Sequence, residues 1–145
     1  SAIEALGDRG VGLTTEIWWS PHHPFNSSLT GISAGDLAGG YSAATGRPWT
    51  QPIGFKHALF EVVADVVSRA EDLDDFEAVA AAIKGTNIST IVGDVNWSNG
   101  PVPNVSKTPL VSGQWQRAGD GVELVITNNG HAPQIPVGGE LQLLG

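Results

Sequence analysis

The sequence lacks cysteine altogether and is poor in positive charge. Without cysteine the chain has no disulfide bond, no zinc ribbon and no thiol nucleophile. Lys and Arg together number 7 against 15 Asp and Glu, a net charge of −8. The basic residues are scattered singly, so no basic face is available for phosphate groups, and nucleic acid is excluded as a partner. No apolar run approaches the roughly 20 residues that a membrane-spanning helix needs.

The composition otherwise describes a globular domain with a hydrophobic core, since 41% of the 145 residues are hydrophobic and only 15% are charged. The opening stretch "SAIEALGDRG" resembles the last turn of a helix that ends at Gly7. A protein rarely begins in this way, so we expect a fragment or a processed product. The lack of a signal peptide therefore carries no weight.

Hydrophobic periodicity and the positions of glycine and proline predict an α/β order of elements. A strand lies in "GVGLTTEIWW", and helices follow from Ser33 to Gly46, over 52–70 and over 74–85. A strand in "ISTIVGDVNW", interrupted by Gly93, precedes two β runs that "RAGDG" joins as a hairpin. We expect three layers, with helices packed against a mostly parallel sheet, and an antiparallel hairpin as an addition.

The helix over 52–70 has more than one apolar row. The first row is Phe55, Leu59, Val62, Val63, Val66 and Ala70, and the second is Phe60 and Val67. A helix with apolar residues around most of its circumference is covered on more than one side. We therefore expect self-association or a further piece of protein against it.

The stretch "GLTTEIWWSPHHPF" concentrates the chemistry-bearing side chains. One reading is a metal-dependent hydrolase that uses Glu16, His22 and His23, but adjacent histidines in extended chain point to opposite sides. The sequence has no His-Glu-x-x-His helix, no Gly-x-Ser-x-Gly turn and no phosphate-binding glycine loop. We therefore expect no catalytic residue, no metal and no cofactor, and the protein is not expected to be an enzyme.

Tryptophans offer a second reading of the same region. Trp18 and Trp19 follow the end of a strand, and Trp49 directly precedes the long helix. Open α/β sheets bind ligands beyond the carboxyl ends of their strands, so these side chains are candidates for a binding surface. The alternative is that they fill the local core.

The order of these segments resembles a known family. The stretches "GLTTEIWWSPHHPF", "LAGGYSAATGRPWTQPIGFKHALFEVVADVVSRA", "TNISTIVGDVNWS" and "TPLVSGQWQRAGDGVELVITNN" are similar to the C-terminal part of type I periplasmic solute-binding proteins of ABC transporters, of the branched-chain amino acid (Leu/Ile/Val) class. The resemblance runs from about Gly7 to Asn129. It implies a periplasmic protein, or an extracytoplasmic lipoprotein, that delivers a small solute to a membrane ABC permease.

The family folds as Rossmann-like lobes that close over the solute. The resemblance assigns residues 1–30 to the C-terminal lobe, 31–97 to the N-terminal lobe and 98–145 to a hairpin and tail of the C-terminal lobe. The rest of the lobes would come from a missing N-terminal portion of the same protein or from self-association. A ligand-sensing receptor ectodomain, which uses the same fold, is an alternative function.

The resemblance also implies the ligand-binding residues of an interlobe cleft. Glu16, Trp18, Trp19 and His22 would line one side, and Trp49 and Gln51 the other. Asp8 or Glu16 would bind an ammonium group. The paired tryptophans and histidines depart from the aliphatic amino-acid binders, and they favour an amino-acid-like, amide or aromatic solute.

Overall fold

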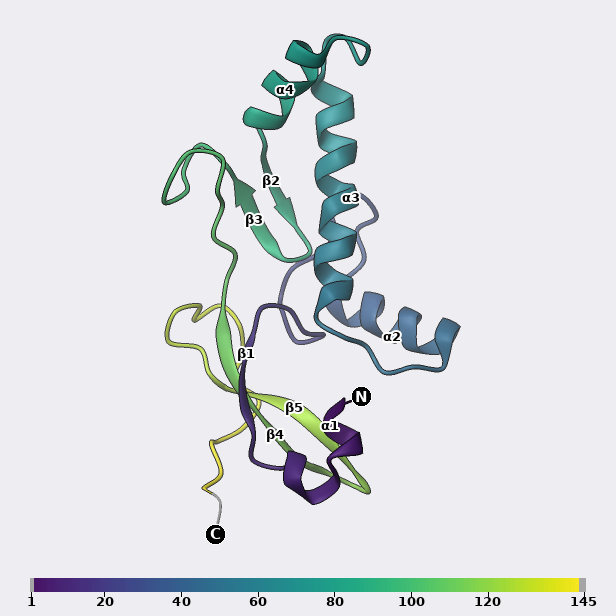
Figure 1. Cartoon of the computed structure of the whole chain (residues 1–145), viewed down its shortest axis with the longest axis vertical. Helices are drawn as coiled ribbons and strands as arrows, with labels where there is room; N and C mark the ends of the chain where they lie inside the picture. The colour runs from purple at the N-terminus through teal and green to yellow at the C-terminus, as the bar shows by residue number, and fades with distance from the viewer. Residues whose placement is uncertain (1, 144–145) are drawn as a thin grey trace. The chain divides into compact units, whose positions relative to one another are not determined.

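A computed structural model describes residues 2–143. The described chain forms two compact units (Figure 1). The first unit comprises the residues up to Trp18 and those from Leu110 onward, and the second comprises Trp19–Pro109. Each unit has helices or a helical turn together with antiparallel strands.

The first unit is built on a three-stranded antiparallel sheet of order β1-β4-β5. Its strands are β1 (Thr14–Ile17), β4 (Val111–Ala118) and β5 (Gly121–Asn128), and they are preceded by the short helix α1 (Ala2–Ala5) and the 3-10 turn η1 (Gly7–Gly10). Gly113 lies in this sheet where there is no room for a side chain. A Cβ there would lie 2.3 Å from Cδ1 of Ile17 and 2.5 Å from the carbonyl oxygen of Val125. Ile17 is fully buried as a result.

A row of glutamine amides fixes the chain after β5 to β4. Gln114 and Gln116 are buried, and their Nε2 groups donate to the carbonyl oxygens of Gln142 and Glu140, each at 2.8 Å. The backbone N–H of Gln142 returns a bond of 2.9 Å to Oε1 of Gln114. These amides satisfy one another away from water, which is the condition for burying polar groups without a large penalty.

The second unit contains the long helices and a small hairpin. Its elements are α2 (Ala34–Thr45), α3 (Pro52–Arg69), α4 (Phe76–Lys84), β2 (Asn87–Thr90) and β3 (Gly93–Asn96). Ser33 and Asp36 form a reciprocal capping box at the start of α2, and Gly46 ends that helix with φ 65°. Small side chains allow close packing in its core, which consists of Trp19, Ala34, Ala38, Ala58, Ile91 and Val92.

The mixed α/β class and the helices are confirmed. The sheet differs from the expectation, because every pair of described strands is antiparallel. The stretch predicted as one strand with an interruption is the β2–β3 hairpin, in which Gly93 has φ 101°. Only two residues separate β2 from β3, and likewise β4 from β5. Such short connections permit only antiparallel pairing.

Helix α3 buries only part of the predicted apolar stripe, and Val66 is the buried member of that stripe. Gly54, Ala58, Glu61 and Val66 are its buried residues. Large apolar side chains on the opposite side are exposed: Leu59 by 55%, Phe60 by 64%, Val63 by 48% and Val67 by 50%. Within the described residues, the second covering that these rows predict is therefore missing from this face.

Candidate functional site

Trp19 begins the loop that also carries His22, and its side chain is completely buried. The indole Nε1–H donates to the carbonyl oxygen of Ile91 at 3.2 Å. The ring lies directly over Gly54 of α3, where a Cβ would be 2.3 Å from its Cγ and Cδ2 atoms. Trp19 is thus the central side chain of the second unit's core. It offers no surface to a solute, so the core alternative describes its side chain.

Trp49 and Gln51 lie against Trp19. The rings of Trp19 and Trp49 meet edge to face, with centroids 6.1 Å apart. Oε1 of Gln51 accepts the backbone N–H of Trp19 at 3.5 Å. Both residues are only partly buried. The turn before α3 therefore presents an indole and an amide to its surroundings, supported from beneath by a rigid aromatic core.

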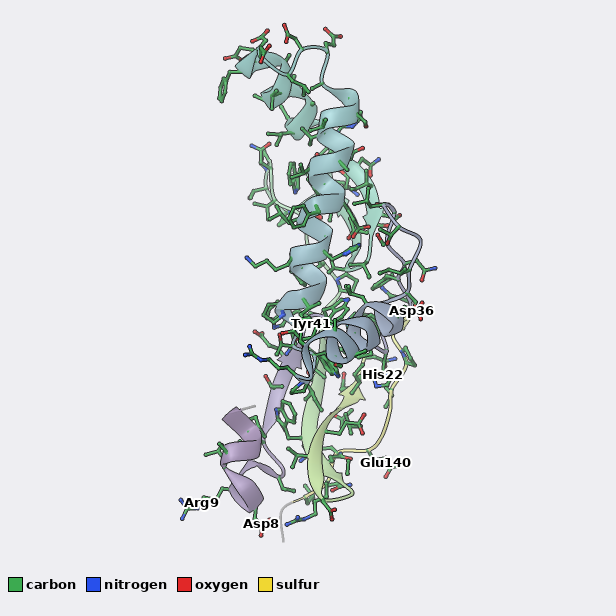
Figure 2. The ribbon with its side chains drawn as sticks, turned by 90° about the vertical axis from the view of Figure 1, so that its right-hand side faces the viewer. Asp8, Arg9, His22, Asp36, Tyr41 and Glu140 are labelled. Atoms are coloured by element: carbon green, nitrogen blue, oxygen red, sulfur yellow. The ribbon has the colours of Figure 1, made fainter. Side chains whose placement is uncertain are left out.

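The two histidines have opposite environments. His22 is exposed on the loop (Figure 2), whereas His23 is buried. Nδ1 of His23 accepts the backbone N–H of Ser20 at 3.1 Å and lies 2.9 Å from its hydroxyl. Nε2 then carries the ring proton, and it is buried without a hydrogen-bond partner. Because His23 is occupied in this way, it does not act with His22 as a pair of metal ligands.

Burial, and secondarily the charge of His22, lowers the pKa of His23 from 6.5 to about 4. Between pH 6.5 and about 4, His23 thus stays neutral in the folded protein but is protonated in the unfolded chain. Between these values the unfolded state binds more protons, so stability falls as the pH is lowered from 6.5 and levels off near pH 4. The full change amounts to about 3 kcal/mol.

We predict that His23→Asn flattens this pH dependence, because the Asn carbonyl oxygen replaces Nδ1 as the acceptor for Ser20 and does not titrate. Urea unfolding at intervals between pH 7 and 4 measures the free energy of unfolding of the parent and of the variant. The difference between the two removes the contribution of the carboxylates, which both proteins share. The exposed His131 provides the control: His131→Gln should retain the parent's slope. Parallel curves for the parent and His23→Asn would contradict the prediction.

Glu16 and Trp18 belong to the first unit, at the end of β1. Glu16 is exposed on the strand and lies opposite Ser112 of β4, while Trp18 is partly buried. An acidic side chain and an indole, two residues apart in the sequence, thus lie at the same end of the sheet.

Asp8 lies at the other end of the same sheet and is exposed (Figure 2). Its carboxylate is 2.6 Å from Nη2 of Arg117, five positions along β4 from Ser112. At about 3.4 Å per residue, Asp8 and Glu16 are on the order of 17 Å apart along the strand. Asp8 is therefore a partner of Arg117, and of the two carboxylates only Glu16 is close to Trp18.

The sequence analysis missed a buried carboxylate, Glu61, which is 2% exposed. Its Oε1 accepts the backbone N–H of Ser28 at 2.6 Å and the Ser28 hydroxyl at 2.9 Å. Its Oε2 accepts the backbone N–H of Ile91 at 3.1 Å. One turn earlier, Nε2 of His57 lies 2.7 Å from the hydroxyl of Ser27. The signal in the sequence was an acidic residue within the apolar rows of α3, which Glu61 shares with Asp65.

Two features of residues 2–143 bear on the requirements of a metal site and of a membrane-spanning helix. No three or more His, Asp or Glu side chains are grouped there in a way that could hold a metal ion. Among the same residues, none of the helices is both long and apolar enough to cross a bilayer.

A solved structure shares the fold of this chain. The chain superposes on an ABC transporter substrate-binding protein from Sphaerobacter thermophilus with a TM-score of 0.60 and 12% identity. The match covers 85% of this chain but only 32% of that one, so the chain spans about a third of that protein's length. At this identity the likeness establishes a shared fold. No family model and no curated protein matches the sequence.

Proposed function

We propose that this chain is part of the solute-binding component of an ABC importer and binds a small amino-acid-like, amide or aromatic solute without transforming it. The observation that carries the proposal is the fold shared with an ABC transporter substrate-binding protein over 85% of the chain. The resemblance of the sequence to the periplasmic type I class points the same way. It adds a location outside the cytoplasmic membrane and a membrane permease as the partner.

The solute chemistry follows from two groups of side chains. In the second unit, the partly buried Trp49 and Gln51 present an aromatic surface and an amide, and the exposed His22 lies on the neighbouring loop. A stacked aromatic face contributes up to roughly 1 kcal/mol beyond the area that it buries. An amide adds a donor and an acceptor of fixed direction. These groups favour a flat solute or one that carries an amide.

The first unit has a charged candidate of its own. Glu16 is an exposed carboxylate on β1, followed two residues later by Trp18. Hydrogen bonds to an ionised acceptor are roughly twice as strong as those between neutral groups. Glu16 therefore favours a solute with an ammonium group or another strong donor.

The rest of the binding protein would cover the exposed side of α3. Leu59, Phe60, Val63 and Val67 form an apolar surface that a monomeric soluble protein rarely leaves open. The solved neighbour has about three times the length of this chain, which supports a further portion of the same protein as the cover. The two compact units support a division into lobe pieces.

The proposal is tested with the protein as its gene encodes it, by a thermal-shift screen of amino acids, amides and aromatic amines followed by calorimetric titration. We expect one solute class to bind. For that solute, Glu16→Gln and Trp49→Ala should each weaken binding tenfold or more, on the order of 1.4 kcal/mol. Glu71→Gln, which removes an exposed carboxylate from the loop after α3, is the matched control and should leave the affinity unchanged.

Three outcomes would contradict the proposal. If no solute of these classes shifts the unfolding transition, the chain is not a receptor for them. If Glu16→Gln and Trp49→Ala bind as the parent does, the solute contacts other residues. A solute consumed during the titration would instead indicate an enzyme.

A further inference from the structure

Helix α4 and the segment after β3 enclose an open apolar groove of about 460 Å³. It lies in the second unit, where α4 stands at the open end of the β2–β3 hairpin (Figure 1). Its lining residues are Phe76, Val79, Ala80, Ile83, Lys84, Trp97 and Asn104. None of these residues belongs to the proposed solute site.

The apolar side of α4 is left without a partner inside the unit. The only buried residue of the helix is Ala82. Phe76 is 79% exposed, Ile83 is 42% exposed, and Leu73 just before the helix is 57% exposed. An amphipathic helix ordinarily turns such a stripe toward the core. Apolar surface of this kind with a polar rim marks a site of interaction with another protein.

The rim at the start of α4 is strongly acidic. Its carboxylates are all exposed: Glu71, Asp72, Asp74, Asp75 and Glu77. Asp75 accepts the backbone N–H of Glu77 at 2.9 Å and caps the helix, and Asp72 accepts that of Asp74 at 2.9 Å in the loop before it. Within residues 2–143 none of the five forms an ion pair with a basic side chain. Their negative charge is thus available to a partner.

We propose that this groove binds a cationic amphipathic segment of a partner protein, with one or two large apolar side chains in the groove and Lys or Arg beside residues 71–77. Helix-in-groove recognition places apolar anchors at helical spacing in this way. Charge complementarity at the rim would fix the orientation and raise the association rate.

The charge argues against a second copy of the chain as the occupant. Two copies that meet symmetrically at this groove would bring the same five carboxylates toward each other, in a chain that already has a net charge of −8. Like charges brought together at an interface oppose association. A basic partner gains from the same arrangement.

The test is an NMR titration of the ¹⁵N-labelled chain with an amphipathic peptide of leucine and lysine, and with the same peptide carrying glutamate in place of lysine. We expect the lysine peptide to shift the Trp97 indole N–H and the amides of α4, and the glutamate peptide to leave them in place. Phe76→Ser should weaken binding about tenfold through the lost anchor. Because Phe76 is exposed, this variant keeps the fold.

A matched pair of double variants isolates the rim. Glu71→Gln with Asp74→Asn removes two charges beside the groove, whereas Asp120→Asn with Glu140→Gln removes two exposed charges from the first unit. The first pair should weaken binding several-fold, and the second should not. Equal effects of the two pairs, or equal binding of both peptides, would overturn the proposal.

Two further results would assign the groove to another occupant and so reject the cationic partner. Shifts of the Trp97 signal with protein concentration alone would indicate a second copy. A Trp97 indole that is already protected from hydrogen exchange in the protein as its gene encodes it, and that does not respond to the lysine peptide, would indicate another part of the same protein.

Discussion

Truncation of Glu61 to alanine is expected to lower the free energy of unfolding by about 3–5 kcal/mol, because it removes a buried charged acceptor from several donors at once. The carboxylate holds two segments far from it in sequence. Ser28 donates through its backbone N–H and its hydroxyl, and Ile91 donates through its backbone N–H. Without the carboxylate, the N–H of Ile91 is left buried and unpaired in the core of the second unit.

Glu61→Gln removes the charge of the side chain but keeps its shape. The amide retains one acceptor oxygen of nearly the same position but turns an NH₂ group toward a donor. We expect it to be destabilised by about half as much as the alanine variant, since hydrogen bonds to charged groups are roughly twice as strong as neutral ones. Glu71→Ala, an exposed carboxylate on the loop that follows α3, should change stability by no more than about 0.5 kcal/mol.

Urea unfolding followed by tryptophan fluorescence measures these differences. Hydrogen exchange at the amides of Ser28 and Ile91 reports the local effect, and both should lose protection in Glu61→Ala. If the alanine variant unfolds at the parent's urea midpoint, the hydrogen bonds of Glu61 do not stabilise the fold.

The helices could be predicted from the sequence because their signals are local. Ser33 with Asp36 at the start of α2, Gly46 at its end and Pro52 at the start of α3 each act within one turn of chain. Capping and proline effects depend on few neighbours, so tertiary packing rarely reverses them. The "RAGDG" connection between β4 and β5 was readable for the same reason.

The sheet could not be predicted as well, because strand pairing depends on distant partners. The residues around Gly93 have strand propensity on both sides, and the sequence does not show whether the chain continues or turns back. Gly93 adopts φ 101°, and a Cβ there would lie 2.9 Å from Cδ of Pro109. Glycine is thus required there both by the turn and by the space that a proline sixteen positions away occupies, which periodicity cannot detect.

The predicted site illustrates a second limit: the sequence does not show which of two adjacent residues is buried. Trp18 and Trp19 are neighbours of the same type, yet Trp19 is fully buried and Trp18 is only partly so. The same holds for His22 and His23. Successive side chains of extended chain point to opposite sides. Which side faces the core is set by α3, and its Gly54 is the partner that selects Trp19.

Gly54→Ala should destabilise the chain by about 1–3 kcal/mol, although glycine in a helix normally gains roughly 1 kcal/mol on replacement by alanine. The new Cβ would lie 2.3 Å from the Trp19 ring, which has no exposed surface and is held by the bond to Ile91. Gly39→Ala in α2 is the control. It adds the same methyl group where nothing lies within 4 Å, so it should stabilise the chain.

Trp19→Ala should cost about 3–5 kcal/mol through the cavity that it leaves in the core. Thermal and urea unfolding of both single variants and of the double variant complete a double-mutant cycle. In the double variant the methyl group introduced by Gly54→Ala occupies part of the space that the indole vacated, so its loss of stability should fall short of the sum by about 1–3 kcal/mol. Strict additivity would show that the two residues do not contact each other. A Trp19→Ala variant with the parent's stability would place its indole outside the core, and Trp19 would return to the candidates for the solute site.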